Sequence, residues 1–206
     1  MAARSALWLA PAPLVLASKS VARRAVLEAA AIPLEIRPAD LDERALEAQG
    51  DAAGPADAAM LLARAKALAV AATLPGRLVL GADQTLALGT RRFSKPADRA
   101  EAADQLRALS GKEHMLHSAI ALARDGAVLF SHCAAARLAM RALSEPMIAA
   151  YLDAAGDAAT ASVGAYQVEG VGIHLFEAIA GDHFTILGLP LLPLLDHLRR
   201  AGLVAA

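Results

Sequence analysis

Short apolar runs alternate, along the first part of the chain, with longer segments whose apolar residues recur at helical spacing. The pattern predicts a strand, a helix, a strand, a helix and a strand over Leu14–Ala17, Val21–Ala31, Leu34–Arg37, Ala56–Leu74 and Leu78–Asp83. This alternation is typical of an α/β sheet.

The later part of the chain follows a different pattern. It predicts a short strand, a helix, two long strands, a helix, a strand and a helix over Thr85–Leu88, Ala97–Leu109, Glu113–Ala123, Ala127–Ala136, Glu145–Ala155, a stretch near Ile173–Ile179, and Pro190–Ala201. Asp125-Gly126 between the two long strands is typical of a type I′ hairpin turn, so the predicted sheet is mixed. Gly50–Gly54 and Gly156–Ala161 are predicted surface loops rather than linkers, and we expect one domain over residues 1–206.

The composition indicates a packed globular fold. Of 206 residues, 57% are hydrophobic and 20% are charged, which argues against intrinsic disorder. The formal net charge of −1 argues against the broad basic surface that nucleic-acid binding needs. Cys133 is the only cysteine, so an intramolecular disulfide is excluded and a reducing cytoplasm is expected.

The N-terminal stretch partly mimics a secretory signal, because Arg4 precedes the apolar segments Leu7–Leu9 and Leu14–Ala17. Pro11 and Pro13 interrupt the apolar run, which favours a first buried strand over a signal. Elsewhere Arg, Asp or Glu break the alanine-rich stretches, so no run approaches the ~20 apolar residues that span a bilayer. We therefore expect a protein that is not embedded in a membrane.

The first candidate for chemistry is Ser18-Lys19-Ser20, where the first strand gives way to a helix. Ser20 is a good N-cap, but Arg23 and Arg24 fall in the first turn, where the helix dipole disfavours cations. A bound anion would reverse that preference, and backbone N–H groups, two hydroxyls, Lys19 and Arg23 would form a phosphate cradle. The alternative is an ordinary cap followed by two solvated arginines.

Acidic residues follow two of the predicted strands. Asp40, Asp42 and Glu43 could hold a hard cation such as Mg²⁺, or they could form a solvated acidic loop. Asp83 ends the apolar run Leu78–Leu80, and ligands of open α/β sheets bind near such strand ends. Asp83 could therefore take a proton from water or hold a metal, or simply cap a turn.

The chain contains few lysines, and most of its basic residues are arginines. Lys66 lies within a predicted helix, and Lys95 precedes Pro96 at the entry to the next one. A compact ammonium suits a phosphate or an acid–metal cluster, whereas a solvated helix face is the alternative for Lys66.

The glycine-rich segment Gly164–Gly172 surrounds Tyr166 and Glu169. Its glycines indicate a tight turn or a close approach to a ligand. Glu169 could accept hydrogen bonds from N1 and N2 of a guanine while Tyr166 offers a stacking face, and a plain β-turn is the alternative. The histidines at 114, 117, 132, 174 and 183 share no metal-ligand spacing, so we interpret them as structural.

These segments, in this order, resemble the Maf family of septum-formation-inhibitor-like nucleoside triphosphate pyrophosphatases. The resemblance covers nearly the whole chain and rests on Leu14–Ser20, Ile32-Pro33, Gly81-Ala82-Asp83, Lys95-Pro96, Leu109–His114, Gly164-Ala165-Tyr166 and Gly188-Leu189-Pro190. It implies an α/β fold with a mixed, strongly twisted sheet flanked by helices and a cleft between two lobes, as in inosine-triphosphatase-like proteins. It also implies a cytoplasmic house-cleaning hydrolase, frequently a homodimer, that cleaves nucleoside triphosphates to monophosphate and pyrophosphate.

The resemblance further implies a divalent metal cation (Mg, Mn or Co) and a set of residue roles. Asp83 becomes the proton acceptor and shares the metal site with Glu43. Phosphate or metal-site duties fall to Ser18, Ser20, Arg23, Lys66 and Lys95.

Three positions bear on the base. Gln84 and Glu169 resemble the branch that prefers 7-methylguanosine triphosphate, because the branch acting on thymidine and uridine triphosphates has Thr and Gln there. Ala22 stands where the methylguanine branch carries a tryptophan. We expect a purine nucleotide, with a thymidine or uridine triphosphate pyrophosphatase, or a non-enzymatic division regulator that binds nucleotide, as the alternatives. Neither a nucleic acid nor a membrane is expected as a partner.

Overall fold

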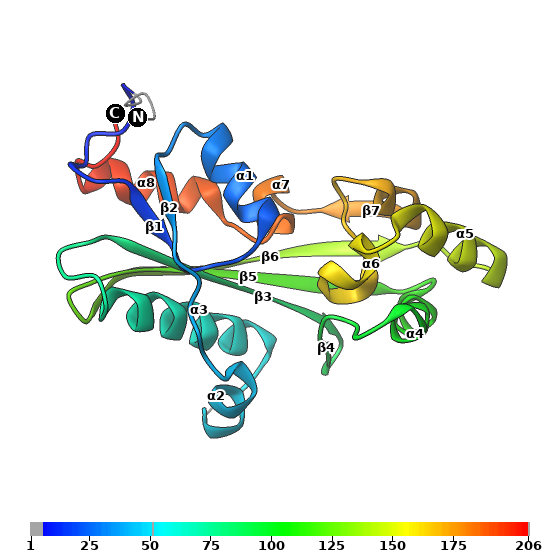
Figure 1. Ribbon diagram of the computed structural model, residues 1–206. Helices are drawn as coiled ribbons and strands as arrows, with labels where there is room; N and C mark the ends of the chain where they lie inside the picture. Colours follow the sequence, from blue (N-terminus) through cyan, green and yellow to red (C-terminus); the bar gives the residue numbers. More distant parts are fainter. Residues whose placement is uncertain (1–5, 51, 206) are drawn as a thin grey trace.

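One mixed sheet of seven strands runs through the computed structural model, which describes residues 6–50 and 52–205. The strand order is β2-β1-β3-β5-β6-β7, and β4 pairs with the end of β3 that β1 does not reach (Figure 1). β1 runs parallel to β2 and β3, and all the other pairs are antiparallel, which confirms the predicted mixed sheet. The strands are β1 Leu14–Leu16, β2 Leu34–Ile36, β3 Val79–Leu88, β4 Arg91–Phe93, β5 Glu113–Arg124, β6 Ala127–Met140 and β7 Phe176–Ala180.

Helices cover both faces of this sheet (Figure 1). Helix α3 packs on one face, α1 and α8 pack on the other, and α4, α5 and α6 gather at the far end of the long strands. The helices are α1 Val21–Ala29, α2 Glu43–Gln49, α3 Pro55–Ala71, α4 Arg99–Leu109, α5 Glu145–Ala155, α6 Ala158–Ala161, α7 His183–Ile186 and α8 Leu191–Arg200, with 3₁₀ turns at Val163–Ala165 and Val171–Leu175.

The side chains of β1 alternate between two cores. Leu14 and Leu16 join the cluster under α1 and α8, whereas Val15 packs with the alanines of α3. A third cluster, built from α4, α5 and the far ends of β3, β5 and β6, is separate from these. The two ends of the sheet thus carry separate cores, in line with the expected two lobes, and the cleft between them stays a prediction.

Helix α3 lies unusually close to β3 because glycine and alanine face each other there. A Cβ at Gly81 would overlap the Ala63 carbonyl oxygen and lie 2.6 Å from the Ala67 amide nitrogen. Lys66 lies between these two alanines on α3, and the close approach brings it against the middle of β3, where it contacts Asp83.

Several predicted boundaries were wrong. Helix α2 was not predicted; it begins at Glu43, within the acidic stretch, because Asp42 caps it by accepting from the Ala45 amide at 3.0 Å. The expected loop Gly156–Ala161 contains the short helix α6, and the strand expected near Ile173 begins at Phe176 because a 3₁₀ turn precedes it. The short elements β4 and α7 were missed, since three or four residues carry little periodicity.

Strand β3 joins two segments that were predicted as separate strands, Leu78–Asp83 and Thr85–Leu88. Polar Asp83 and Gln84 interrupt the apolar run, but the backbone pairs with β5 without a break from Val79 to Ala87. Asp83 therefore lies in the middle of a strand rather than at its end.

No helix within the described residues has the length and apolar character needed to cross a bilayer. Arg4, the charge that suggested a signal, lies outside the described residues, and the apolar segment after it forms β1.

His114 packs inside the third cluster, which we call the far core, and we expect it to make the free energy of unfolding depend on pH. Its side chain is 1% exposed, its Nε2 lies 2.7 Å from the Tyr166 hydroxyl, and burial lowers its pKa to about 4. The unfolded chain, with a pKa near the ordinary 6.5, binds more protons between these values, so the free energy of unfolding falls as the pH drops through this window. We expect a loss of about 2 kcal/mol between about pH 7 and pH 5 from this group. Urea unfolding of wild type and His114→Gln at both pH values measures it, and equal losses in the two proteins would contradict it.

Candidate active site

Asp83 lies beside the carboxyl end of β1. β1 pairs with β3 only as far as Leu16 opposite Leu80, and beyond that point the chain turns away through Ser18 into α1. β4 does not begin to pair with β3 until Leu86. No strand pairs with this edge of β3 around Asp83, so side chains can approach it. The sequence predicted that Asp83 lies at the end of its own strand; it lies instead beside the end of the neighbouring strand β1.

The Arg23 guanidinium fills part of that gap. Its Nη1 donates to the Ala82 carbonyl at 2.9 Å and to Ser18 Oγ at 3.1 Å, and its Nε donates to the Gly188 carbonyl at 2.8 Å. Among the described residues Nη2 has no hydrogen-bond partner, so its two N–H groups remain available as donors. Arg23 is thus held by protein oxygens and still offers donors to a ligand.

Two serines shape the entry to α1. Ser20 caps the helix by accepting from the Arg23 amide at 3.3 Å, and Ser18 Oγ accepts from the Ser20 amide at 3.2 Å. Ser18 is 8% exposed, so its hydroxyl is a buried part of the turn. Of the side chains predicted for the cradle, Ser18, Ser20 and Arg23 lie together, whereas Lys19 is exposed and makes no hydrogen bond to them in the described part of the chain. Arg24 forms an ion pair with Glu28.

Lys66 joins the two candidate metal-site acids. Its Nζ lies 2.6 Å from Asp83 Oδ1 and 2.8 Å from Glu43 Oε1. The Lys66 and Asp83 side chains are 12% and 11% exposed, while Glu43 is half exposed. This geometry agrees with the prediction that Lys66 belongs with the acids. It disagrees with the alternative, in which Lys66 lies on a solvated face of the helix.

The Asp83 cluster, made of Asp83, Glu43, Lys66, Arg23 and Lys95, carries an excess of positive charge. Lys95 is exposed and forms no ion pair with these acids in the described part of the chain, but it lies within electrostatic range of the cluster. Partial loss of solvent, with Arg23 nearby, lowers the pKa of its ammonium. Three cations against two carboxylates leave one net positive charge, which favours an anionic ligand. Burial also raises the pKa of the Asp83 carboxyl, and Lys66 and Arg23 oppose that rise. A carboxylate with a raised pKa is a better proton acceptor.

The donor set fits a hard divalent cation. The carboxylates of Glu43 and Asp83 converge on one point, now taken by a lysine ammonium, and oxygen ligands are those that Mg²⁺ prefers. Within the described residues no group of three or more His, Cys, Asp or Glu side chains could hold a metal, but Mg²⁺ often uses one or two carboxylates and takes its other ligands from water and phosphate. Asp42 is occupied as a helix cap and Asp40 is exposed, so Glu43 is the acid of this run that reaches the cluster.

Two residues expected to touch the base are placed differently. Tyr166 is 4% exposed, its ring meets Phe176 edge-on at 4.8 Å, and its hydroxyl bonds His114, so it has no free face for stacking. The expected stacking role is therefore wrong for this structure, because the ring completes the far core. Glu169 lies exposed on the turn after Gln167, and in the described part of the chain no contact joins it to the Asp83 cluster.

Gln84 and Ala22 lie beside the cluster. Gln84 follows Asp83 on β3, and its Nε2 donates to Ser118 Oγ at 2.8 Å and to the Ile186 carbonyl at 3.0 Å. A carbonyl only accepts, so Nε2 faces these oxygens, and Oε1 has no hydrogen-bond partner within the described residues. Ala22 lies in the first turn of α1 next to Arg23 and adds no aromatic surface.

The histidines fit the structural interpretation. His132 and His197 stack on Phe130, with ring centroids at 6.4 and 4.3 Å, and His114 lies in the far core. Lys112 donates to the Ala108 carbonyl and caps α4 far from the cluster.

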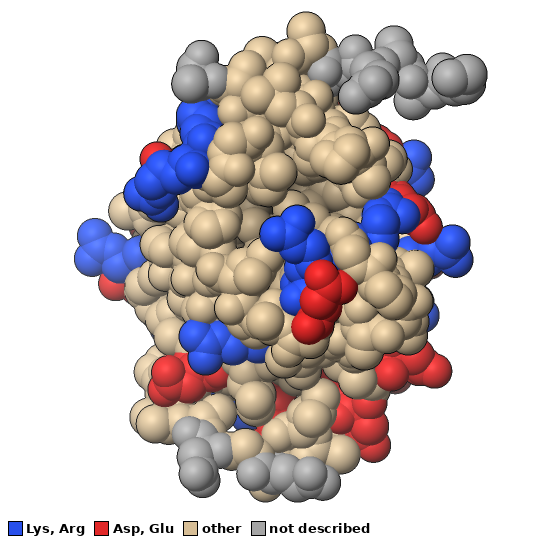
Figure 2. Space-filling model, turned by 90° about the vertical axis from the view of Figure 1, so that its left-hand side faces the viewer, with Lys and Arg blue, Asp and Glu red and all other residues tan. Residues whose placement is uncertain are grey.

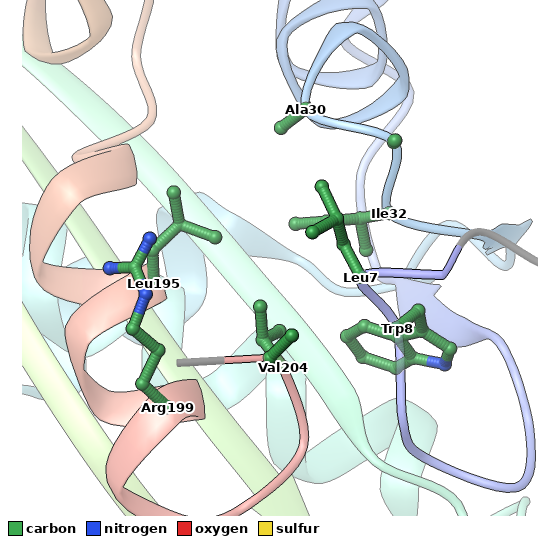
Figure 3. Close-up of a pocket in the computed structure, with 9 residues that line it drawn as sticks. Leu7, Trp8, Ala30, Ile32, Leu195, Arg199 and Val204 are labelled. Atoms are coloured by element: carbon green, nitrogen blue, oxygen red, sulfur yellow. The ribbon is translucent and has the colours of Figure 1, made fainter.

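Other surface features lie away from the cluster. An apolar pocket between the N-terminal segment, the end of α1 and α8 is lined by Leu7, Trp8, Ile32, Leu195, Arg199 and Val204, among others (Figure 3). None of the candidate site residues lines it. On the face shown in Figure 2, basic side chains stand singly or beside acidic ones, and no broad basic area is seen.

Ser118 and Thr185 contact the site but were not predicted. Both are polar and buried, at 0% and 2% exposure. Ser118 donates to the Thr185 carbonyl, and Thr185 lies three residues before Gly188, whose carbonyl accepts from Arg23. The available signal was Ser118 standing next to the otherwise apolar run Ala119–Ala123 of β5.

A buried carboxylate thus lies among cations beside the end of β1, which leads into a capped helix. In α/β proteins this arrangement is typical of sites that bind phosphate groups. Residues 13–201 match the family of Maf-like proteins, and the chain belongs to that family.

Two curated relatives cover nearly the full chain. A protein of Rhodopseudomonas palustris (strain BisB18), named nucleoside triphosphate pyrophosphatase, is 60% identical over 97% of this chain and 98% of its own. A protein of Rhizobium etli, named 7-methyl-GTP pyrophosphatase, is 54% identical over 93% of this chain and 97% of its own. Among solved structures, a HAM1 protein from Coxiella burnetii aligns with a TM-score of 0.43 and 21% identity over 62% of this chain and 72% of that one.

Proposed function

We propose that this protein is a nucleoside triphosphate pyrophosphatase that hydrolyses the bond between the α- and β-phosphates. The observation that carries the proposal is the buried Asp83 carboxylate, held by Lys66 and flanked by Arg23. A proton acceptor surrounded by cations suits attack of water on a phosphate whose charge must be offset. The names of the relatives from Rhodopseudomonas palustris and Rhizobium etli support it.

The proposed roles are those that the family resemblance implies for these residues, and the contacts described above support them. Asp83 accepts the proton of the attacking water, while Arg23, with Ser18 and Ser20 behind it, and Lys95 bind phosphate oxygens. Glu43 and Asp83 hold the divalent cation, which when bound supplies positive charge to the phosphate oxygens. In the absence of the cation, the Lys66 ammonium bridges the two carboxylates.

A pyrophosphate-release assay across ordinary and modified nucleoside triphosphates tests this function. We expect pyrophosphate and nucleoside monophosphate in equal amounts. Release of single phosphates would contradict the proposed bond, and tight binding without turnover would favour the division regulator instead.

We further propose that the preferred base is a purine, with 7-methylguanine the best candidate. The name of the Rhizobium etli relative supports this, as does the free acceptor Oε1 of Gln84. Guanine presents two adjacent donors, which suit an acceptor such as Glu169, whereas uracil and thymine present one donor between two carbonyls. Ala22 adds no stacking surface, so preference rather than strict selection is expected.

Glu169→Gln tests this assignment. We expect the ratio of kcat/KM between guanosine and uridine triphosphates to fall by about 5- to 150-fold, the equivalent of about 1–3 kcal/mol for mispaired polar contacts. Glu177→Gln, an exposed acid on β7, is the control. An unchanged ratio, or a wild type that prefers thymidine or uridine triphosphate, would rule out Glu169 as the base reader and leave the pyrophosphatase standing.

We also propose where the protein is located in the cell and that it forms a homodimer. A cytoplasmic house-cleaning enzyme is supported by the single Cys133, and a homodimer is expected from the family resemblance. Size-exclusion chromatography with light scattering measures the assembly directly.

A further inference from the structure

A buried hydrogen-bond network connects β5 to the segment that holds Arg23. Ser118 lies in β5 opposite Gln84 of β3 and has no exposed surface. Its Oγ donates to the Thr185 carbonyl at 2.7 Å and accepts from Gln84 Nε2 at 2.8 Å. One hydroxyl thus uses both its donor and an acceptor position on neighbours from two elements.

The Thr185 carbonyl is the centre of this network. Besides the Ser118 hydroxyl, it accepts from the Gly188 amide at 3.0 Å and from Gln84 Nε2 at 3.3 Å. Gln84 Nε2 also binds the Ile186 carbonyl, so the end of α7 is tied to the sheet at two consecutive carbonyls. A four-residue helix such as α7 has little stability of its own, so these hydrogen bonds determine its position relative to the sheet.

The end of α7 in turn places Gly188. Gly188 has φ +85°, and a Cβ there would lie 3.2 Å from Arg23 Nε. Its carbonyl accepts from that same Nε at 2.8 Å. Any shift of the segment from Thr185 to Gly188 would therefore move the acceptor that orients the guanidinium.

We propose that Ser118 is a positioning residue for Arg23, acting through the Thr185 carbonyl, Gln84 and the Gly188 carbonyl. This inference rests on the proposed function only in taking Arg23 as a phosphate-binding group. Ser118 touches no ligand in this scheme. Its effect on phosphate binding reaches the substrate through the guanidinium, and tripolyphosphate, which has no base, isolates that effect from any change at Gln84.

Ser118→Ala removes the donor to Thr185 and the acceptor for Gln84. We expect KM for the nucleoside triphosphate to rise about 5- to 20-fold, with kcat within about threefold of wild type, because phosphate binding is weakened in ground and transition states alike. Affinity for inorganic tripolyphosphate, measured by calorimetry, should fall by the same factor. Ser118→Thr, which keeps the hydroxyl, should restore both values to within about threefold.

Ser131→Ala is the matched control, because this serine lies on β6 and its hydroxyl accepts from Arg64 Nη2 at 2.8 Å. It should leave KM unchanged. Thermal unfolding of each variant separates a local effect from loss of the fold.

A double-mutant cycle with Arg23→Lys decides between positioning and general structural support. If Ser118 acts through Arg23, then Ser118→Ala in the lysine background changes tripolyphosphate affinity by less than about twofold. An equal loss in both backgrounds would overturn the inference, as would an unchanged KM in Ser118→Ala. If the wild type hydrolyses no nucleotide, the proposed function fails, and the tripolyphosphate cycle still supports or overturns the role of Ser118 by the same criteria.

Discussion

Asp83→Asn is expected to lower turnover by about 10²–10⁴-fold, the effect of losing a general base. Asparagine keeps the size and one oxygen of the side chain but cannot take up a proton at neutral pH. The fold should survive, because Lys66 keeps Glu43 as a partner at 2.8 Å and is not left as an unpaired buried charge. Steady-state pyrophosphate release with saturating nucleotide measures kcat, and circular dichroism confirms folding.

The control for this variant is Asp98→Asn, another acid-to-amide change. Asp98 caps α4 by accepting from the Glu101 amide at 2.8 Å, and asparagine caps helices equally well. Its turnover should match wild type. Wild-type activity in Asp83→Asn would remove Asp83 from the reaction and leave the cluster as a binding site.

Removal of divalent cations should reduce activity by roughly 100-fold or more, since a metal contributes several kcal/mol of charge stabilisation. The cluster has one net positive charge, too little to offset the charge of a triphosphate. Dialysis against a chelator, followed by separate return of Mg²⁺, Mn²⁺ and Co²⁺, measures the dependence and the preferred ion. Full activity after exhaustive chelation would refute the metal requirement.

The acid that helps to hold the cation is tested by Glu43→Gln. We expect the concentration of Mg²⁺ for half-maximal activity to rise about 10-fold or more, because one of two carboxylate ligands is lost. Glu47→Gln lies on the same helix, one turn later, and its partner is Arg92 Nη1 at 2.9 Å. This control should leave the Mg²⁺ requirement unchanged, and equal shifts in both variants would argue against a role for Glu43.

Elements that depend on near neighbours in the chain were determined by the sequence alone. Helix α5 spans Glu145–Ala155 as predicted, and its start follows from the Ser144 cap and a proline in the first turn. Asp125 and Gly126 adopt φ values of 52° and 78°, which the type I′ turn requires. Periodicity, caps and turn residues act over a few positions, so one chain is enough to identify them.

The residue types of the site were also available from the sequence, because charged groups in an apolar chain stand out. Asp83, Lys66 and Arg23 were selected for their chemistry and do lie together. Their contacts were not predictable. Lys66 binds an acid 17 residues away, and Arg23 binds a carbonyl 165 residues away, and no local pattern encodes such distances.

Only the tertiary structure decided which polar residues face the ligand and which complete a core. Tyr166 stands in a glycine-rich motif that suggests a binding surface, yet the packing of β5, β6 and β7 encloses it with His114 and Phe176. Asp83 gains its open neighbourhood because β1 ends at Leu16 and β4 begins only opposite Leu86, a matter of strand register. Register and burial depend on the whole set of packed elements, and this is why the sequence determined the chemistry of the site while the fold determined its geometry.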